Sequence, residues 1–418
     1  MMYRAFGATD EGRVRDVNED NLLVVTPPDE ALGLFVVADG AGGAAHGDVA
    51  SRLFVDELRR YFDAERDRFA AYELADDQAL RKPLVELLVS LMNRAGNAVF
   101  ELSQHRRAMS GMCTTATVLV LCNGGAFLGH VGDGRAYLIR EGVTYRLTED
   151  HTWANELAQQ CDLSPGQIPS APYGHVVTRT FGFAPKIDVD TLFFPLRPAD
   201  RIVLCTDGLH RYVRGKEIEA LSPTLPAAQG LADSLVQRSL ERGGEDNVSV
   251  VVVDALQDDG VAAPGPVGFH QQVGLLRNLF LFEFLNDQEV MRVMRIVYQQ
   301  QRAAGEHIIE EGTEGREIFV VVQGSVEVSV KGEPLTTIGV GGHFGELALI
   351  DHQVRSATVT AKEDVTLLTI DHQDFYGLVR SEHSLASKLL WSFLKNVAGR
   401  VRELSDEVAQ LSRAAPQR

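Results

Sequence analysis

The segment QDDGVAAPGPVGFHQQ, at positions 257–272, divides this chain of 418 residues into two parts. Proline, glycine, alanine and polar side chains dominate it, so it has too few large apolar side chains to build a core. We interpret it as a linker. A chain of this length has room for about two or three domains, and the linker predicts two, one over residues 1–256 and one over residues 273–418.

The balance of charges excludes several classes of function. The chain has 40 Lys+Arg against 58 Asp+Glu, a formal charge of −18, whereas binding to nucleic acid needs clustered basic residues. The 4 cysteines show no CxxC spacing, so neither a zinc site nor a disulfide framework is indicated. No run approaches the ~18 apolar residues of a membrane span, and the N-terminus lacks the apolar region of a signal peptide. We therefore expect a cytoplasmic protein with neither nucleic acid nor membrane as partner.

The first part of the chain alternates short β-like runs with amphipathic helices. Runs rich in Val, Ile, Leu and Thr predict strands at Leu32–Ala38, Thr115–Cys122, Ala126–Val131, Ala136–Arg140, Arg201–Thr206 and Asn247–Asp254. Apolar residues at spacings of three and four predict helices at Asp48–Glu65, Ala79–His105 and Leu231–Arg242. Asn123-Gly124-Gly125 and Glu141-Gly142 predict hairpin turns, so the sheet is at least partly antiparallel. This pattern indicates a sheet sandwich covered by helices.

The second part begins with a helical stretch, Val273–Gln301, in which Asn286 and Glu289 form a possible capping box. Short strands punctuated by glycines follow it and predict a small all-β barrel or jelly roll. A last helix is predicted from about Leu385 to Leu411. The fold class of the whole chain is therefore α+β.

Acidic residues stand at the ends of the β-like runs of the first part. They are Glu19, Asp20, Asp39, Asp133, Asp207 and Asp246. Strand ends that emerge at one rim of a sandwich would bring these charges together, and carboxylates at ~4–6 Å repel one another unless cations or shared protons intervene. Oxygen ligands suit Mg²⁺ or Mn²⁺ rather than zinc. Taken singly, each residue is an ordinary turn or strand-end residue; together they indicate a metal site.

Eight segments of the first part carry a resemblance to a known family. They are DEGRVRDVNEDN (10–21), VVADGAGGAAHGDVAS (36–51), GMCTTATVLVL (111–121), GHVGDGRAYLIREG (129–142), LTEDHTWANELAQQ (147–160), TRTFG (178–182), VLCTDGLHRYV (203–213) and GGEDNVSVVVV (243–253). In this order they resemble the metal-dependent Ser/Thr protein phosphatases of type 2C, over residues 1–255. The resemblance implies an αββα sandwich with a two-metal site at one end.

The resemblance also implies how the metal site is built. Asp39 would bridge the two ions, the carbonyl of Gly40 would bind one of them, and Glu19 would reach a metal through water. Asp207 and Asp246 would complete the site.

It further implies the chemistry. Asp20 would hold metal-bound water, Arg15 would grip the substrate phosphate through two hydrogen bonds, and a water between the metals would attack phosphorus in line.

Some positions depart from the family pattern. Bacterial relatives place a third metal on the aspartate matched by Asp133 and on an acid at the position of Arg211, where a cation disfavours that metal. Gly134 replaces a serine, and Ala41 stands where animal relatives have a general-acid histidine. Three nearby histidines, His46, His151 and His175, fit surface or capping positions better than that role. Residues 151–175 read as a mobile flap over the site.

The second part resembles the cyclic-nucleotide-binding domain, through GEHIIEEGTEGREIFVVVQGSVEVSV (305–330) and FGELALIDHQVRSATVTA (344–361). Its predicted ligand residues are Gly345, Glu346, Leu347, Ala348, Arg355 and Ser356. Arg355, the Ser356 hydroxyl and the amides near Leu347 and Ala348 would bind the cyclic phosphate, and Glu346 the ribose hydroxyl. Alternatively, Arg355 and Glu346 merely pair with each other. The segment is compatible with cAMP and with cGMP; we favour cAMP.

The last helix has an apolar seam at spacings of four and three. Its residues are Leu390, Leu394, Val397, Val401, Leu404, Val408 and Leu411. Such a seam predicts a parallel homodimer; packing on the helix's own barrel is the alternative.

We therefore predict a phosphatase for phosphoserine and phosphothreonine that uses two Mg²⁺ or Mn²⁺ ions and is regulated by a cyclic nucleotide. A non-catalytic, nucleotide-responsive adaptor and a constitutive phosphatase whose second domain only dimerises are the alternatives.

Overall fold

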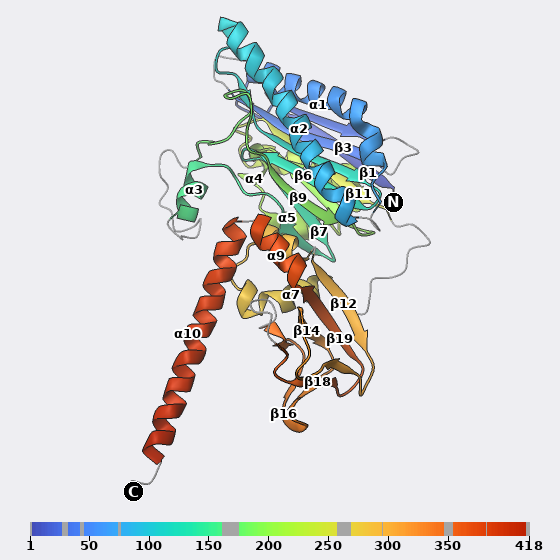
Figure 1. Ribbon diagram of the computed structural model, residues 1–418. Coiled ribbons are helices and arrows are strands. Elements are labelled where there is room, and N and C mark those ends of the chain that lie inside the picture. The colour runs from blue at the N-terminus through green and yellow to red at the C-terminus, as the bar shows by residue number, and fades with distance from the viewer. Residues whose placement is uncertain are drawn as a thin grey trace. The chain divides into compact units, whose positions relative to one another are not determined.

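The computed structural model describes residues 2–26, 32–41, 46–73, 77–160, 175–256, 269–294, 296–346, 354–381 and 383–414. The chain divides into two compact units, Met1–Ala263 and Pro264–Arg418 (Figure 1). Residues 269–272, which the sequence analysis placed in the linker, form the first turn of helix α7 (Phe269–Arg277). Val273 and Leu276, three residues apart on this helix, are buried.

The first unit contains two antiparallel sheets. Their strand orders are β1-β11-β10-β7-β8 and β2-β3-β5-β6-β9, with β4 paired to β3. The strands are β1 (Tyr3–Asp10), β2 (Asp20–Val25), β3 (Leu32–Ala41), β4 (Cys113–Thr114), β5 (Ala116–Cys122), β6 (Gly125–Val131), β7 (Arg135–Arg140), β8 (Val143–Arg146), β9 (Asp190–Pro195), β10 (Arg201–Cys205) and β11 (Val248–Ala255). The helices are α1 (Gly47–Ala70), α2 (Asp77–His105), η2 (Arg107–Met109), α3 (Trp153–Gln160), α4 (Asp207–His210), α5 (Gly215–Leu221) and α6 (Ala228–Glu241).

Both predicted hairpin turns are present. Asn123 and Gly124 have φ values of 44° and 85° and join β5 to β6, and Glu141 and Gly142 have φ values of 53° and 77° and join β7 to β8. Two successive residues with positive φ match the right-handed twist of the strands that they connect.

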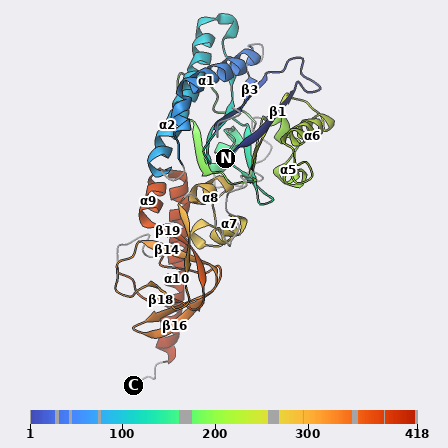
Figure 2. The same cartoon turned by 90° about the vertical axis from the view of Figure 1, so that its right-hand side faces the viewer.

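Helices cover the outer face of each sheet, as Figure 2 shows with α1 and α2 on one side and α5 and α6 on the other. Phe54 and Leu58 of α1 belong to one core cluster with Val36 of β3, and Leu231 of α6 belongs to a second cluster with Val250 of β11. The alternate side chains of these strands face the other sheet and are equally buried. Because one face of each central strand packs on helices and the other on the second sheet, these strands are apolar along their length. The predicted αββα sandwich is confirmed.

The second unit has two antiparallel sheets of four strands, in the orders β12-β19-β14-β17 and β13-β18-β15-β16. This arrangement agrees with the predicted jelly roll. The strands are β12 (Val297–Arg302), β13 (His307–Ile309), β14 (Glu317–Gln323), β15 (Val326–Val330), β16 (Glu333–Ile338), β17 (His343–Phe344), β18 (Thr358–Ala361) and β19 (Val365–Asp371). Besides α7, the helices are η4 (Phe280–Phe282), α8 (Asp287–Met294), α9 (His372–Ser381) and α10 (His383–Ala414).

The predicted capping box begins α8. The backbone N–H of Glu289 donates to the side chain of Asn286 at 2.8 Å, and the backbone N–H of Asn286 donates to the side chain of Glu289 at 2.9 Å. Two N–H groups that the helix leaves unpaired are thereby satisfied. Within the part of the chain that is described, no helix combines the length and the apolar character that a membrane span requires.

Candidate functional site

Three of the predicted acidic residues converge in the structure. Asp39 lies near the end of β3, Asp133 in the turn between β6 and β7, and Asp207 on the first turn of α4, directly after β10. Their carboxylate oxygens lie within 4.8 Å of one another. β3 runs on past Asp39 to Ala41, beyond its predicted end at Ala38, because Gly40 and Ala41 pair with β4. A fourth carboxylate, Asp20, begins β2 and lies opposite Asp39 in the strand pair.

Burial and mutual repulsion act together on these carboxyl groups. Burial, with the neighbouring carboxylates, raises the pKa of Asp39 well above its usual range and raises that of Asp207. The same causes raise the pKa of Asp20 and of Asp133 to about 7. Oδ1 of Asp207 is buried and accepts no hydrogen bond from a described residue. Carboxylate oxygens are the ligands that hard divalent cations prefer, and Oδ1 of Asp207 is still without a partner among the described residues, so the cluster fits such a cation.

Two glycines let the strand ends approach closely. The N–H of Gly40 donates to the carbonyl of Glu19 at 3.1 Å, and a Cβ at Gly40 would lie 2.0 Å from the carbonyl oxygen of Gly47. The side chain of Glu19 accepts a hydrogen bond from the N–H of Gly47 at 3.1 Å. At the other sheet, a Cβ at Gly208 would lie 1.9 Å from the carbonyl oxygen of Asn247. A side chain at Gly40 would therefore push β3 away from the start of α1, and one at Gly208 would push α4 away from Asn247, next to Asp246.

Two arginines meet at Asp246, which precedes β11. Arg15 donates to Oδ1 from Nε at 3.0 Å and to Oδ2 from Nη2 at 3.2 Å. Arg211 donates from Nη1 to Oδ2 of Asp246 at 3.3 Å and pairs through Nη2 with Asp207. The structure thus places Arg15 beside the acidic cluster, as predicted, and adds Arg211 as a second cation there.

Neighbouring polar side chains fix the acidic residues, and the sequence analysis did not single them out. Thr206 donates from Oγ1 to Oδ2 of Asp20 at 2.8 Å. Oδ1 of Asn247 accepts from the N–H of Glu19 at 2.9 Å, and Oγ1 of Thr115 accepts from the N–H of Asp39 at 3.2 Å. Thr206 and Asn247 each adjoin an acidic residue, Asp207 and Asp246, and that adjacency was the available signal, whereas Thr115 lies in a quoted segment without acidic residues.

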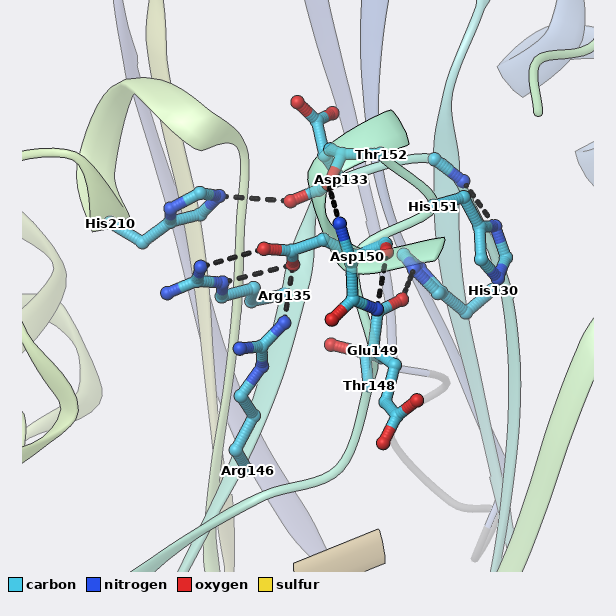
Figure 3. A network of polar contacts seen from close by, with 12 residues as sticks. His130, Asp133, Arg135, Arg146, Thr148, Glu149, Asp150, His151, Thr152 and His210 are labelled. Atoms are coloured by element: carbon cyan, nitrogen blue, oxygen red, sulfur yellow. Dashed lines mark hydrogen bonds and ion pairs between the residues drawn. The ribbon is translucent and has the colours of Figure 1, made fainter. Parts of the chain in front are cut away.

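A polar network supports the turn that carries Asp133 (Figure 3). Nε2 of His210 donates to the carbonyl of Asp133 at 2.9 Å, and Nδ1 of His151 accepts from the N–H of Gly132 at 3.0 Å. Arg135 binds Asp150 with two hydrogen bonds, at 3.0 and 2.7 Å. Burial lowers the pKa of His210 to about 3, so its ring is neutral at pH 7.

The three histidines of the sequence analysis have different surroundings. His46 is the N-cap residue of α1 and His175 is exposed, as expected. His151 is buried, with Nε2 at 3.2 Å from Asp190, so the expectation of a surface position is wrong for this residue. Its side chain fills the space behind the Asp133 turn. Of the predicted flap, residues 161–174 lie outside the described chain.

A cavity of about 320 Å³ adjoins the acidic cluster. Its wall combines acidic and basic side chains. They include Asp133, Arg135, Arg146, Asp207, His210 and Arg211.

In the second unit, Arg355 is half-buried and donates to two backbone carbonyls, Gly345 at 3.3 Å and Glu317 at 2.9 Å. A Cβ at Gly315 would lie 1.7 Å from Nε of Arg355, so that glycine makes room for the guanidinium. The structure thus brings Arg355 to Gly345, next to Glu346, whereas Ser356 is exposed. Two further predicted ligand residues, Leu347 and Ala348, lie outside the described residues.

Two family profiles match the chain. One, described as protein phosphatase 2C, matches residues 11–251. The chain belongs to the protein phosphatase 2C family. The other profile, described as a cyclic nucleotide-binding domain, matches residues 299–382 of this 2C phosphatase. The predictions of an enzyme, of a phosphatase and of its fusion to a cyclic nucleotide-binding domain are confirmed.

Named relatives match the first unit. The 2C phosphatase is 31% identical over 247 residues to the serine/threonine phosphatase stp of Listeria monocytogenes, an alignment that covers 59% of this chain and 93% of the relative. The crystal structure of the Mycobacterium tuberculosis phosphatase PstP/Ppp matches with a TM-score of 0.53 and 28% identity, over 62% of this chain and 100% of that one. The catalytic domain of PstP in complex with 2 manganese ions matches with a TM-score of 0.50 and 28% identity, over 61% and 99%.

Thr206 provides a test of the support around the cluster. Thr206→Val removes the donor to Asp20 at nearly constant volume, so we expect phosphatase activity with Mn²⁺ to fall by about 10- to 100-fold. Thr206→Ser retains the hydroxyl and should keep most of the activity. Release of inorganic phosphate measures both, with circular dichroism to check folding. A folded valine variant with wild-type activity would show that Asp20 needs no such support.

Proposed function

We propose that this 2C phosphatase hydrolyses phosphoserine and phosphothreonine in proteins at the cluster around Asp39, and that a cyclic nucleotide bound to its second unit regulates it. The observation that carries the first part is the convergence of three carboxylates, two of them buried and that of Asp39 partly buried, within 4.8 Å. The family membership and the two manganese ions of the PstP catalytic domain support it. Two Mg²⁺ or Mn²⁺ ions are the proposed cofactors.

The proposed metal ligands surround Asp39. Asp39 would lie between the two ions, with the carbonyl of Gly40, the side chain of Glu19, and Asp207 and Asp246 around it. Asp133, whose carboxylate shares the cluster, is a further proposed ligand. When bound, the metal pair supplies positive charge that lowers the pKa of water and offsets the charge of the phosphoryl group.

Two other side chains are proposed to act on water and phosphate. Asp20 has one oxygen fixed by Thr206, which leaves the other to orient a water and accept its proton. Burial raises the pKa of Asp20 to about 7 in the protein without metal, and cations bound nearby would lower it again, so that the carboxylate would be charged and able to accept a proton. Arg15 is half-exposed beside the cluster, so its guanidinium can bind the phosphate through two hydrogen bonds.

Asp39 is the decisive residue for catalysis. We expect Asp39→Asn to lower Mn²⁺-dependent hydrolysis of p-nitrophenyl phosphate by about 100-fold or more, because the cluster loses its central charge. Asp233→Asn, at an exposed position of α6, removes the same charge away from the site and should leave turnover unchanged. If the wild-type chain shows no turnover, or if Asp39→Asn matches it, the proposed site is wrong.

For the second unit, we propose a cyclic-nucleotide site formed by Gly345, Glu346, Leu347, Ala348, Arg355 and Ser356, with cAMP favoured. The profile match and the placement of Arg355 beside Gly345 support it. A bound nucleotide can change turnover only through a difference in affinity between two arrangements of the protein.

Replacing Arg355 tests this site. Arg355→Met removes the proposed partner of the cyclic phosphate, so we expect the Kd for cAMP, measured by calorimetry, to rise by about 10- to 100-fold. Arg316→Met, at an exposed position of the same unit, is the matched control. Phosphate release with and without cAMP or cGMP shows whether the nucleotide affects turnover. Equal affinity in wild type and Arg355→Met would exclude this site.

The helix α10 supports a proposal of a homodimer. Leu390, Leu394, Val397 and Val401 follow its predicted seam and are 61%, 52%, 39% and 56% exposed, whereas Leu385 and Leu389 are buried. Packing on the barrel therefore covers only the first turns. A second copy of the same seam has the matching spacing and apolar character. The side chains of Leu404, Val408 and Leu411 lie outside the described ones.

A single charge on the seam tests the dimer. Leu394→Glu should convert the dimer to a monomer in sedimentation equilibrium, because a dimer would bury two carboxylates. Gly399→Glu adds the same charge where an added Cβ meets no described atom within 4 Å, and it should remain dimeric. A monomeric wild type, or a dimeric Leu394→Glu, would overturn the proposal.

A further inference from the structure

Arg211 lies against the acidic cluster because of its place in the sequence. It follows α4, and its N–H donates to the carbonyl of Asp207 at 3.0 Å, one helical turn earlier. Residues four apart lie on the same helix face, so the guanidinium reaches the carboxylate of Asp207 and, at 3.3 Å, that of Asp246. One cation thus joins two of the proposed metal ligands.

Arg211 occupies one oxygen of each of these two carboxylates. It takes Oδ2 of Asp207 and shares Oδ2 of Asp246 with Arg15. A guanidinium and a divalent cation carry charge of the same sign, so both cannot lie against the same oxygen without strong repulsion. A metal bound at these carboxylates is therefore repelled by Arg211 for as long as the guanidinium stays in place.

The difference in burial between Arg211 and Asp207 indicates which of the two side chains can move. The side chain of Arg211 is 44% exposed, whereas that of Asp207 is 6% exposed. Asp207 is held at the start of α4, where Ser239 binds the carbonyl of the adjacent Gly208 at 2.6 Å. Arg211 also lines the cavity of about 320 Å³, which offers its guanidinium another position. The carboxylates can thus stay in place while the arginine leaves.

We propose that Arg211 is a tethered cation that competes with divalent metal for Asp207 and Asp246 and thereby sets the metal affinity of the centre. The proposal rests on the metal site of the proposed function. Arg211 stabilises the carboxylates of the metal-free protein and weakens their affinity for metal. The enzyme consequently fills its metal site at a higher metal concentration than the same carboxylates without Arg211.

The experiment measures Mn²⁺ binding to the full chain by calorimetry, without reference to activity. Arg211→Met should lower the Kd for Mn²⁺ by about tenfold, because the competing charge-assisted hydrogen bonds are gone. Arg211→Lys retains one charge but cannot hold two carboxylates at once, so its Kd should lie between the two. Arg146→Met removes a cation from the same cavity wall, where Arg146 pairs with Asp150, and should change the Kd much less.

Thermal unfolding separates competition from a general effect of charge. Without metal, Arg211→Met should unfold at a lower temperature than the wild type, since the carboxylates lose their cation. With saturating Mn²⁺ that difference should disappear. A wild type that binds Mn²⁺ while Arg211→Met binds it no more tightly overturns this proposal and leaves the metal site standing. No Mn²⁺ binding by the wild type or by any variant overturns the metal site, and this proposal with it.

Discussion

Repulsion among buried carboxylates at one end of the sandwich is the constraint on which the site depends. Burial and the neighbouring carboxylates hold the pKa of Asp39 well above its usual range, and the charged form of such a cluster is unfavourable until cations balance it. The sandwich supplies the geometry, because Asp39 comes from one sheet and Asp207 from the end of the other. The apolar strands behind them keep water out, and the same low polarity strengthens every charge interaction at the rim.

The polar residues around the cluster hold the carboxylates in place without neutralising them. Thr206 and Thr115 offer hydroxyls, and Asn247 offers an amide, so each fixes a position but adds no charge. Charge is instead offset by Arg15 and Arg211 at the exposed side of the cluster. Neutral hydrogen-bonding side chains on the inside and cations on the more exposed side give a centre whose shape does not depend on its charge balance.

Much of the fold and half of the centre could be predicted from local sequence. Apolar runs followed by acidic residues predicted β3 and β10. The glycine-containing turn sequences predicted both hairpins, and their residues have the positive φ values that such turns need. β1 was missed because its apolar and polar residues are mixed and its partner, β11, lies at the far end of the first unit. Among site residues, the meeting of Asp39, Asp133 and Asp207 was foreseen. The pairing of Asp246 with both Arg15 and Arg211 was not foreseen. It depends on the conformations of the arginine side chains, which the spacing of residues in the sequence does not determine.

The order of binding follows from the same charges. Without divalent cations the cluster offers a phosphate dianion no free positive charge, because Arg15 is held by Asp246 and Arg211 by Asp207 and Asp246. If Asp246 holds metal, as proposed, its oxygens would no longer hold Arg15, and the guanidinium would be available to phosphate oxygens. Under the proposed function, metal binding would therefore both reverse the local charge and release Arg15 for the substrate. Metal would then bind before phosphate, and Asp246 would be the residue through which the first event prepares the second.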